Sequence, residues 1–171
     1  MTAVIFHSQI KIIHPLNMAR AKAEAIINPT SGDATFMKEI IMGYQGEMSL
    51  KGLNRNQFEA AMMKILRYRL KTVGKFKVYC TQSTFYMEPE EEDVDMDLAF
   101  DRVSKVFGLA ALSRAVVCDK DFDTICQTAE DYLGTSLHGI RTFKVEARRA
   151  DKTYPMTSPE LMRELGAYLL G

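Results

Sequence analysis

The chain has 171 residues, of which 47% are hydrophobic and 26% charged, and its formal net charge is zero. These values are typical of a soluble globular protein with one ordinary domain or two small ones. A net charge of zero, taken alone, argues against binding to nucleic acid. No apolar stretch approaches the roughly 20 residues of a membrane span, and the N-terminus lacks a signal-peptide pattern. We therefore expect a cytoplasmic protein with no membrane partner.

The zero net charge is an average over opposed segments. Residues 37–85 contain nine Lys and Arg against three Asp and Glu, whereas residues 86–101 contain eight acidic residues and no basic one. Charge segregation of this kind indicates a local interaction surface better than the total does. The three cysteines form no C-x-x-C pair, so neither a disulfide framework nor a zinc site is predicted.

Residues 1–36 form a segment with little pattern. Ala19–Ile27 is compatible with two turns of helix, and the Pro- and Gly-containing run 28–33 ends it. The segment is too short to build a core of its own. We expect it to be an unassigned N-terminal extension, whose removal would leave the stability of the fold nearly unchanged.

Residues 37–117 predict a ferredoxin-like βαββαβ domain. The expected elements are a strand over 38–42, a helix over 57–72, strands over 75–81 and 84–87, a helix over 97–106 and a strand over 112–117. Apolar residues recur at steps of three and four along the first helix, which Asn54 or Asn56 would cap. Gln82 and Ser83 form the tight turn of a hairpin. The order strand-helix-strand, repeated once, is the split βαβ arrangement, so the fold class is α+β.

Residues 118–171 predict a partial α/β domain. A helix over 121–133, capped by Asp121 or Asp123, is followed by a strand over 141–149 and a helix over 158–170 that Ser158 caps. No later strand is available to pair with 141–149, so we expect an open sheet edge there. Gly134 and Gly139 would bracket a loop. This domain is expected to be C-terminally incomplete, with the natural polypeptide continuing past Gly171.

Two groups of basic residues are candidates for binding a polyanion. The first group is Lys51, Asn54, Arg55, Lys64, Arg67 and Lys71. The second group is Lys144, Arg148, Arg149 and Lys152, together with Tyr154. Lys and Arg neutralise phosphates, and a tyrosine ring can stack on an unpaired base. The alternative is that these residues are the ordinary solvated faces of a helix and an edge strand.

The sequence predicts no catalytic residue. It contains no nucleotide-binding glycine loop of the G-x-x-x-x-G-K-[ST] or G-x-G-x-x-G type. The acidic run Glu88–Asp93 is expected to be a solvated connection that favours the start of the next helix, with a metal site as the alternative. Cys118 and Cys126 are expected to pack in a core.

Three stretches resemble the N-terminal part of the tRNA sulfurtransferases, which make 4-thiouridine in tRNA and are often tied to thiamine biosynthesis. G-E-M-S-L-K-G-L-N-R-N-Q-F at 46–58 is similar to the opening signature of that family. S-K-V-F-G-L-A at 104–110 resembles the end of its ferredoxin-like domain, and the stretch 142–170 resembles its THUMP module. The resemblance assigns 37–117 to the ferredoxin-like domain and 118–171 to an incomplete THUMP domain.

The resemblance implies that these two domains hold the acceptor end of tRNA, so the two basic groups above become RNA-binding candidates. In the family, a later PP-loop domain uses ATP and Mg²⁺, and a cysteine desulfurase supplies sulfur as a persulfide. The S-G-G-x-D-S motif of that domain and the active-site cysteine that follows it are absent here. We therefore expect no cofactor in this chain and no complete sulfurtransferase reaction from it alone; the family also admits a homodimer.

A second class of function remains open from the sequence. A ferredoxin-like module can mediate protein contacts or sense a small ligand. In that case the open strand edge at 142–149 would be the docking site, by addition of a strand from the partner.

Overall fold

The computed structural model describes residues 2–4, 10–13, 38–45, 55–137, 141–147 and 153–171. The chain divides into two compact units, one of residues 39–115 and one of residues 1–38 together with 116–171. The first is called the ferredoxin-like unit below, and the other the second unit. Within the described residues, no helix has the length and apolar character needed to cross a membrane.

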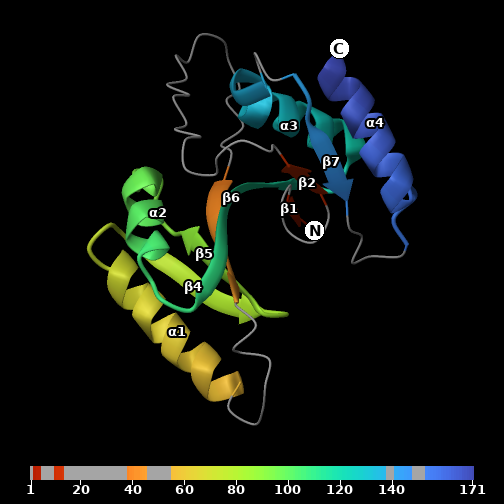
Figure 1. Cartoon of the computed structure of the whole chain (residues 1–171). Helices are drawn as coiled ribbons and strands as arrows, with labels where there is room; N and C mark the ends of the chain where they lie inside the picture. Colours follow the sequence, from red (N-terminus) through yellow and green to blue (C-terminus); the bar gives the residue numbers. More distant parts are fainter. Residues whose placement is uncertain (1, 5–9, 14–37, 46–54, 138–140, 148–152) are drawn as a thin grey trace. The chain divides into compact units, whose positions relative to one another are not determined.

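Among its described residues, the ferredoxin-like unit has four strands and two helices (Figure 1). In chain order they are β3 (Lys38–Gln45), α1 (Arg55–Leu70), β4 (Phe76–Thr81), β5 (Thr84–Pro89), α2 (Met96–Ser104) and β6 (Leu109–Asp119). The strand order is β6-β3-β5-β4, with β3 antiparallel to β5 and β5 antiparallel to β4. This βαββαβ topology confirms the predicted fold class.

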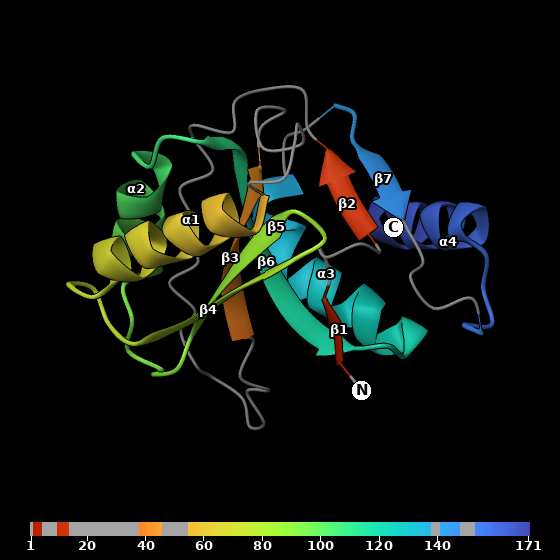
Figure 2. The same ribbon diagram turned by 90° about the horizontal axis from the view of Figure 1, so that it is seen from below.

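The core of this unit lies between one sheet face and the two helices, which lie side by side in both ribbon views (Figure 2). Leu66 of α1 and Phe85 of β5 are both 0% exposed. Four consecutive residues of β3, 40–43, are buried, and Ile41 among them belongs to the core beneath the helices. The register places Ile41, Met87 and Val78 in one row beneath the helices.

The β4–β5 hairpin turns at the two residues that the sequence predicted. Thr81 pairs with Thr84, so Gln82 and Ser83 form a two-residue loop, and both have positive φ values of 49° and 67°. These values correspond to a type I′ turn, whose twist matches that of the flanking strands. Neither residue is glycine, so the turn stores some backbone strain.

The helices at 55–70, 96–104 and 122–137 differ from their predicted bounds by one to four residues, whereas the helix at 158–170 matches its predicted bounds. Asn56 lies inside α1 and is not its cap, and Asn54 lies outside the described residues. Asp95 caps α2, accepting a hydrogen bond of 2.8 Å from the Leu98 amide. Asp121 caps the next helix in the same way through Thr124, as the sequence suggested.

The second unit is built from α3 (Phe122–Leu137), β7 (Lys144–Ala147) and α4 (Ser158–Leu170), with α3 and α4 packed on one apolar core (Figure 1). The prediction that Gly134 begins a loop is wrong, since α3 continues through it. The cap of α4 is Thr157 and not Ser158. Thr157 and Glu160 form a reciprocal capping box, which explains why the neighbouring serine is not needed. The prediction that Cys118 and Cys126 pack in a core is confirmed.

Two short N-terminal strands belong to the second unit. β1 (Thr2–Val4) pairs with the end of β6, and β2 (Ile10–Ile13) pairs antiparallel with β7 over 144–147. Among the described strands, the predicted open edge is therefore confined to one side of β7, because β2 pairs with the other side. The Ile10-Lys-Ile-Ile13 run is rich in β-branched residues, which favour strands, but its partner is more than 130 residues away in sequence. The local sequence pattern therefore could not predict which strand pairs with β2.

We predict that Leu66→Ala lowers the free energy of unfolding by about 2–5 kcal/mol, because it opens a cavity under α1. The neighbouring Ile65→Ala is the matched control, since Ile65 is 43% exposed. Urea unfolding followed by circular dichroism measures both. Equal losses for the two variants would contradict the proposed orientation of α1.

We also predict that Cys118 and Cys126 react slowly with a thiol reagent in the folded protein. Burial raises the pKa of each thiol to about 11. At pH 8 roughly one thiol in a thousand is then ionised, and the core excludes the reagent. The Cys80→Ser variant isolates these two thiols. Rapid labelling without denaturant, as fast as in urea, would show that the core is not closed.

Candidate nucleic-acid interface

The outward face of α1 is basic because its inward face is fixed by packing. Met62, Leu66 and Leu70 recur every four residues and are buried against the sheet. Residues on the other side of the helix must then face solvent. That side carries the exposed residues Lys64, Arg67 and Arg69, with Lys71 directly after the helix end. The only carboxylate of α1 is Glu59.

Arg67 is held in place by the sheet. Its Nη2 donates a 2.8 Å hydrogen bond to the carbonyl oxygen of Val78 in β4. β4 is last in the strand order of the described sheet, so this bond satisfies a carbonyl at the sheet edge. The guanidinium has five N–H donors, so one bond to the protein leaves others for a ligand.

Lys64 and Lys71 are the uncompensated charges of this face. Both are exposed, and within the part of the chain that the structure describes neither has an ion-pair partner. Lys71 follows the last turn of α1, where a cation is favoured by the partial negative charge of the helix C-terminus. Together with Arg67, these side chains make a positive strip along the second half of the helix.

Arg55, by contrast, is tied into the fold. Its Nε donates to Glu59 Oε1 at 2.8 Å and its Nη2 donates to the Ser83 hydroxyl at 3.0 Å. Glu59 also accepts a 3.2 Å bond from Gln45 Nε2. The bond from Arg55 is the main reason why the pKa of Glu59 is lowered. These contacts join the end of β3, the start of α1 and the hairpin turn.

The second basic group is only partly described. Lys144 is exposed on β7, but its Nζ lies 2.8 Å from Glu146 Oε1, which neutralises much of its charge. Tyr154 is half-buried against the core of the second unit instead of standing free as a stacking ring. The other predicted residues, Lys51, Asn54, Arg148, Arg149 and Lys152, lie outside the described residues.

The acidic run after β5 has structural contacts. Glu88 bonds to the Tyr79 hydroxyl, and Glu91 forms an ion pair of 3.3 Å with Lys75. Asp97 and Glu39 both pair with Arg114, which joins α2, β3 and β6. In the described ranges, no three His, Cys, Asp or Glu side chains come together as metal ligands.

Comparison with known proteins matches both halves of the chain. The ThiI ferredoxin-like domain family matches residues 39–113, and the THUMP domain family matches residues 119–171. A “Probable tRNA sulfurtransferase” of Acetivibrio thermocellus is 39% identical over 136 residues, and one of Alkaliphilus metalliredigens is 40% identical over the same length. The chain belongs to the tRNA sulfurtransferase family.

This member of the tRNA sulfurtransferase family spans about one third of the length of those relatives. The alignments cover 78% of this chain but 35% and 34% of the two relatives. A crystal structure of a 4-thiouridine synthetase–RNA complex with bound ATP superposes with a TM-score of 0.59 at 25% identity, over 78% of this chain and 33% of that one. A Pyrococcus horikoshii protein has the same fold, with a TM-score of 0.61 at 21% identity over 77% of this chain and 44% of that one.

The sequence did not reveal the structural role of Arg55 in the tRNA sulfurtransferase signature. The spacing of Arg55 and Glu59, four residues apart on a helix, was a readable signal for an ion pair. The bond to Ser83 had no local signal, because 28 residues separate the two partners. Arg55 was predicted as a phosphate contact, and in the structure it also supports the start of α1.

We predict that Arg55→Ala and Glu59→Gln both lower the midpoint of urea unfolding at pH 7, because each removes the ion pair between Arg55 and Glu59. The pKa of Glu59 is lowered in the folded state, so its contribution to stability is present above its unfolded pKa of about 4.5 and is lost as the pH falls through the folded value. The difference between the wild type and Glu59→Gln should therefore shrink below about pH 4.5.

The control for this pH profile is Glu92→Gln, which removes an exposed carboxylate from the same unit. Its stability difference should be small at neutral pH. A Glu59→Gln curve that parallels the wild type from pH 3 to pH 7 would contradict the role given to the pair.

Proposed function

We propose that this chain is a tRNA-binding part of an enzyme that makes 4-thiouridine by ATP-dependent sulfur transfer. The observation that carries the proposal is the positive strip of Lys64, Arg67 and Lys71, which faces outward on a domain of the tRNA sulfurtransferase family. Phosphate contacts of this kind supply most of the affinity of a non-sequence-specific RNA surface. The likeness to a 4-thiouridine synthetase–RNA complex supports the same function.

The acceptor end is the part of tRNA that we propose as the ligand. It combines an A-form helix, which proteins recognise by shape and phosphate, with an unpaired 3′ strand. We assign ATP, Mg²⁺ and the persulfide-donating cysteine desulfurase to no residue of this chain, because its sequence contains no S-G-G-x-D-S motif. In this proposal the described residues hold RNA and do not perform the sulfur transfer.

The alternative of strand addition at 142–149 is less well supported. One edge of β7 is already paired with β2 over 144–147, which leaves only the other edge for a partner strand among the described residues. The basic strip of α1 needs no such rearrangement to reach a ligand. We therefore retain the RNA-binding function alone.

We predict that the double variant Lys64→Ala/Lys71→Ala weakens binding to tRNA and makes it less sensitive to salt. Losing two phosphate contacts should reduce the slope of log affinity against log salt by roughly 1.4 to 1.8. Fluorescence anisotropy between 50 and 200 mM salt measures the slope, and circular dichroism confirms that the variant is folded.

The matched control is Lys105→Ala/Arg163→Ala, which also removes two exposed cations. Each of these is already paired with a carboxylate, Lys105 with Asp101 at 2.6 Å and Arg163 with Glu164 at 2.7 Å. The control should keep the wild-type slope. The same loss in both variants would show a nonspecific charge effect, and no salt-dependent tRNA binding by the wild type would refute the proposed function.

A further inference from the structure

A groove of about 660 Å³ opens on the ferredoxin-like unit where α1 ends and β4 begins. Its walls include Arg67, Tyr68, Lys71, Lys75, Phe76 and Glu90. This volume is within the range of about 300–1,000 Å³ that small-ligand sites occupy. The groove adjoins the positive strip of α1 but adds two kinds of group that the strip lacks, namely aromatic rings and carboxylates.

The three basic side chains of the groove differ in how free they are to bind an anion. Lys75 is paired with Glu91, and Arg67 already donates one bond to the Val78 carbonyl, which holds its guanidinium at the wall. Lys71 has no ion-pair partner among the described side chains. The free positive charge is therefore concentrated at the end of α1, where Lys71 and Arg67 are one helical turn apart. One phosphate is the anion that such a pair fits.

Two aromatic rings line the same groove. Tyr68 is 76% exposed, although it lies on a helix that buries its other large apolar residues more deeply. Phe76 is half-buried and packs against the core, so it forms a fixed part of the wall. An exposed ring beside free cations is the combination that binds single-stranded nucleic acid, because a base stacks on the ring while the phosphate meets the charge.

The groove is also lined by two carboxylates, those of Glu90 and Glu91. The Glu90 amide donates to the Lys75 carbonyl at 2.9 Å, and the Lys75 amide donates to Glu91 Oε2 at 3.5 Å. These bonds fix the segment after β5 against the start of β4. A carboxylate in the same groove disfavours a ligand that is only phosphate, and it accepts hydrogen bonds from a base amine or a ribose 2′-hydroxyl.

We propose that this groove binds one unpaired nucleotide of an RNA strand, with its phosphate on Lys71 and Arg67 and its base stacked on Tyr68. The proposal rests on the RNA-binding function given above and adds a subsite for a single-stranded segment. The aromatic ring then makes the ferredoxin-like unit distinguish RNA with an unpaired end from a blunt duplex. Phosphate contacts along the positive strip do not provide that distinction.

The test uses the whole 171-residue chain and two RNA hairpins, one blunt and one with a four-nucleotide unpaired 3′ tail. Tyr68→Ala should weaken binding of the tailed hairpin about 5- to 160-fold, the effect of losing one stacked base. Binding of the blunt hairpin should not change. Tyr68→Phe keeps the ring and should keep wild-type affinity. A 2-aminopurine in the tail should be quenched on binding to the wild type and not to Tyr68→Ala.

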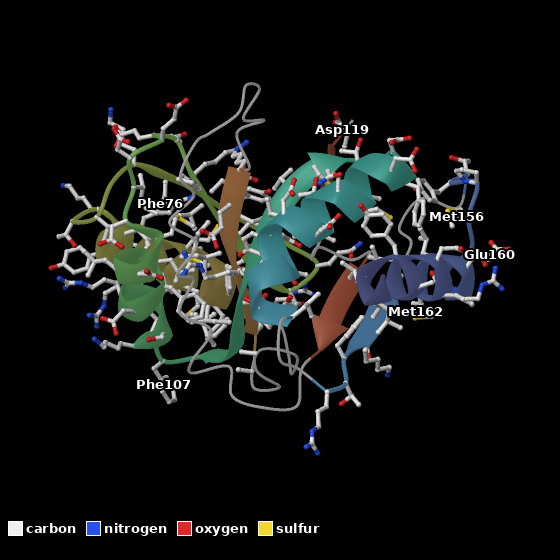
Figure 3. All side chains as sticks on the ribbon, turned by 90° about the horizontal axis from the view of Figure 1, so that it is seen from above. Phe76, Phe107, Asp119, Met156, Glu160 and Met162 are labelled. Carbon is white, nitrogen blue, oxygen red and sulfur yellow. The ribbon has the colours of Figure 1, made fainter. Side chains whose placement is uncertain are left out.

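Phe107→Ala is the matched control, because Phe107 is 91% exposed yet lies elsewhere on the same unit. Figure 3 shows Phe76 and Phe107 at opposite ends of the unit, and the adjacent Gly108 lies against Phe58 and Met62, in the first half of α1. Both Tyr68 and Phe107 are surface positions, so neither variant should unfold. Phe107→Ala should leave binding of both hairpins unchanged.

The outcomes separate this subsite from the proposed function. Salt-dependent binding of both hairpins with no effect of Tyr68→Ala would overturn the subsite and leave RNA binding intact. Absence of binding to either hairpin would overturn both. A free mononucleotide that binds as tightly as the tailed hairpin would contradict the assignment to an RNA strand.

Discussion

The packing of α1 on the sheet determines where the ferredoxin-like unit can present charge. Met62, Leu66 and Leu70 are 3%, 0% and 1% exposed, and each buried side chain of this size contributes about 1.5–3 kcal/mol relative to an exposed one. The helix cannot rotate about its axis without exposing that row. Lys64 and Arg67 are consequently held outward, so the core itself orients the candidate interface.

The whole chain has zero net charge, but positive and negative side chains of the ferredoxin-like unit are unevenly distributed over its surface. Much of the acidic segment after β5 is engaged in the fold, with Glu91 on Lys75 and Asp97 on Arg114. Those carboxylates neutralise Lys75, which precedes β4, and Arg114 of β6, and they leave Lys64 and Lys71 at the outer face of α1 without an ion-pair partner among the described residues. Arg55 and Arg67 of this helix both bond to the protein, so these basic residues support the fold while bordering the candidate interface.

The sequence predicted the elements of the ferredoxin-like unit because each has a strong local pattern. Periodicity over 57–72 and alternation over 75–81 are such patterns, and the order of the elements then restricts the topology to few choices. Contacts between distant residues could not be predicted: the pairing of β2 with β7 and the bond from Arg55 to Ser83. Tyr68, which we propose as a stacking residue, was not predicted from the sequence because a single tyrosine on a helix face has no distinguishing pattern.

The turn at Gln82 and Ser83 restricts which residues homologues can have at position 83. Ser83 accepts two bonds, its carbonyl from the Gln45 amide at 3.2 Å and its hydroxyl from Arg55, at the two points that flank residues 46–54. Glycine at position 83 would adopt its left-handed conformation without strain but would remove the hydroxyl acceptor. Positions 55 and 83 should therefore covary among homologues, with glycine at 83 accompanying loss of arginine at 55.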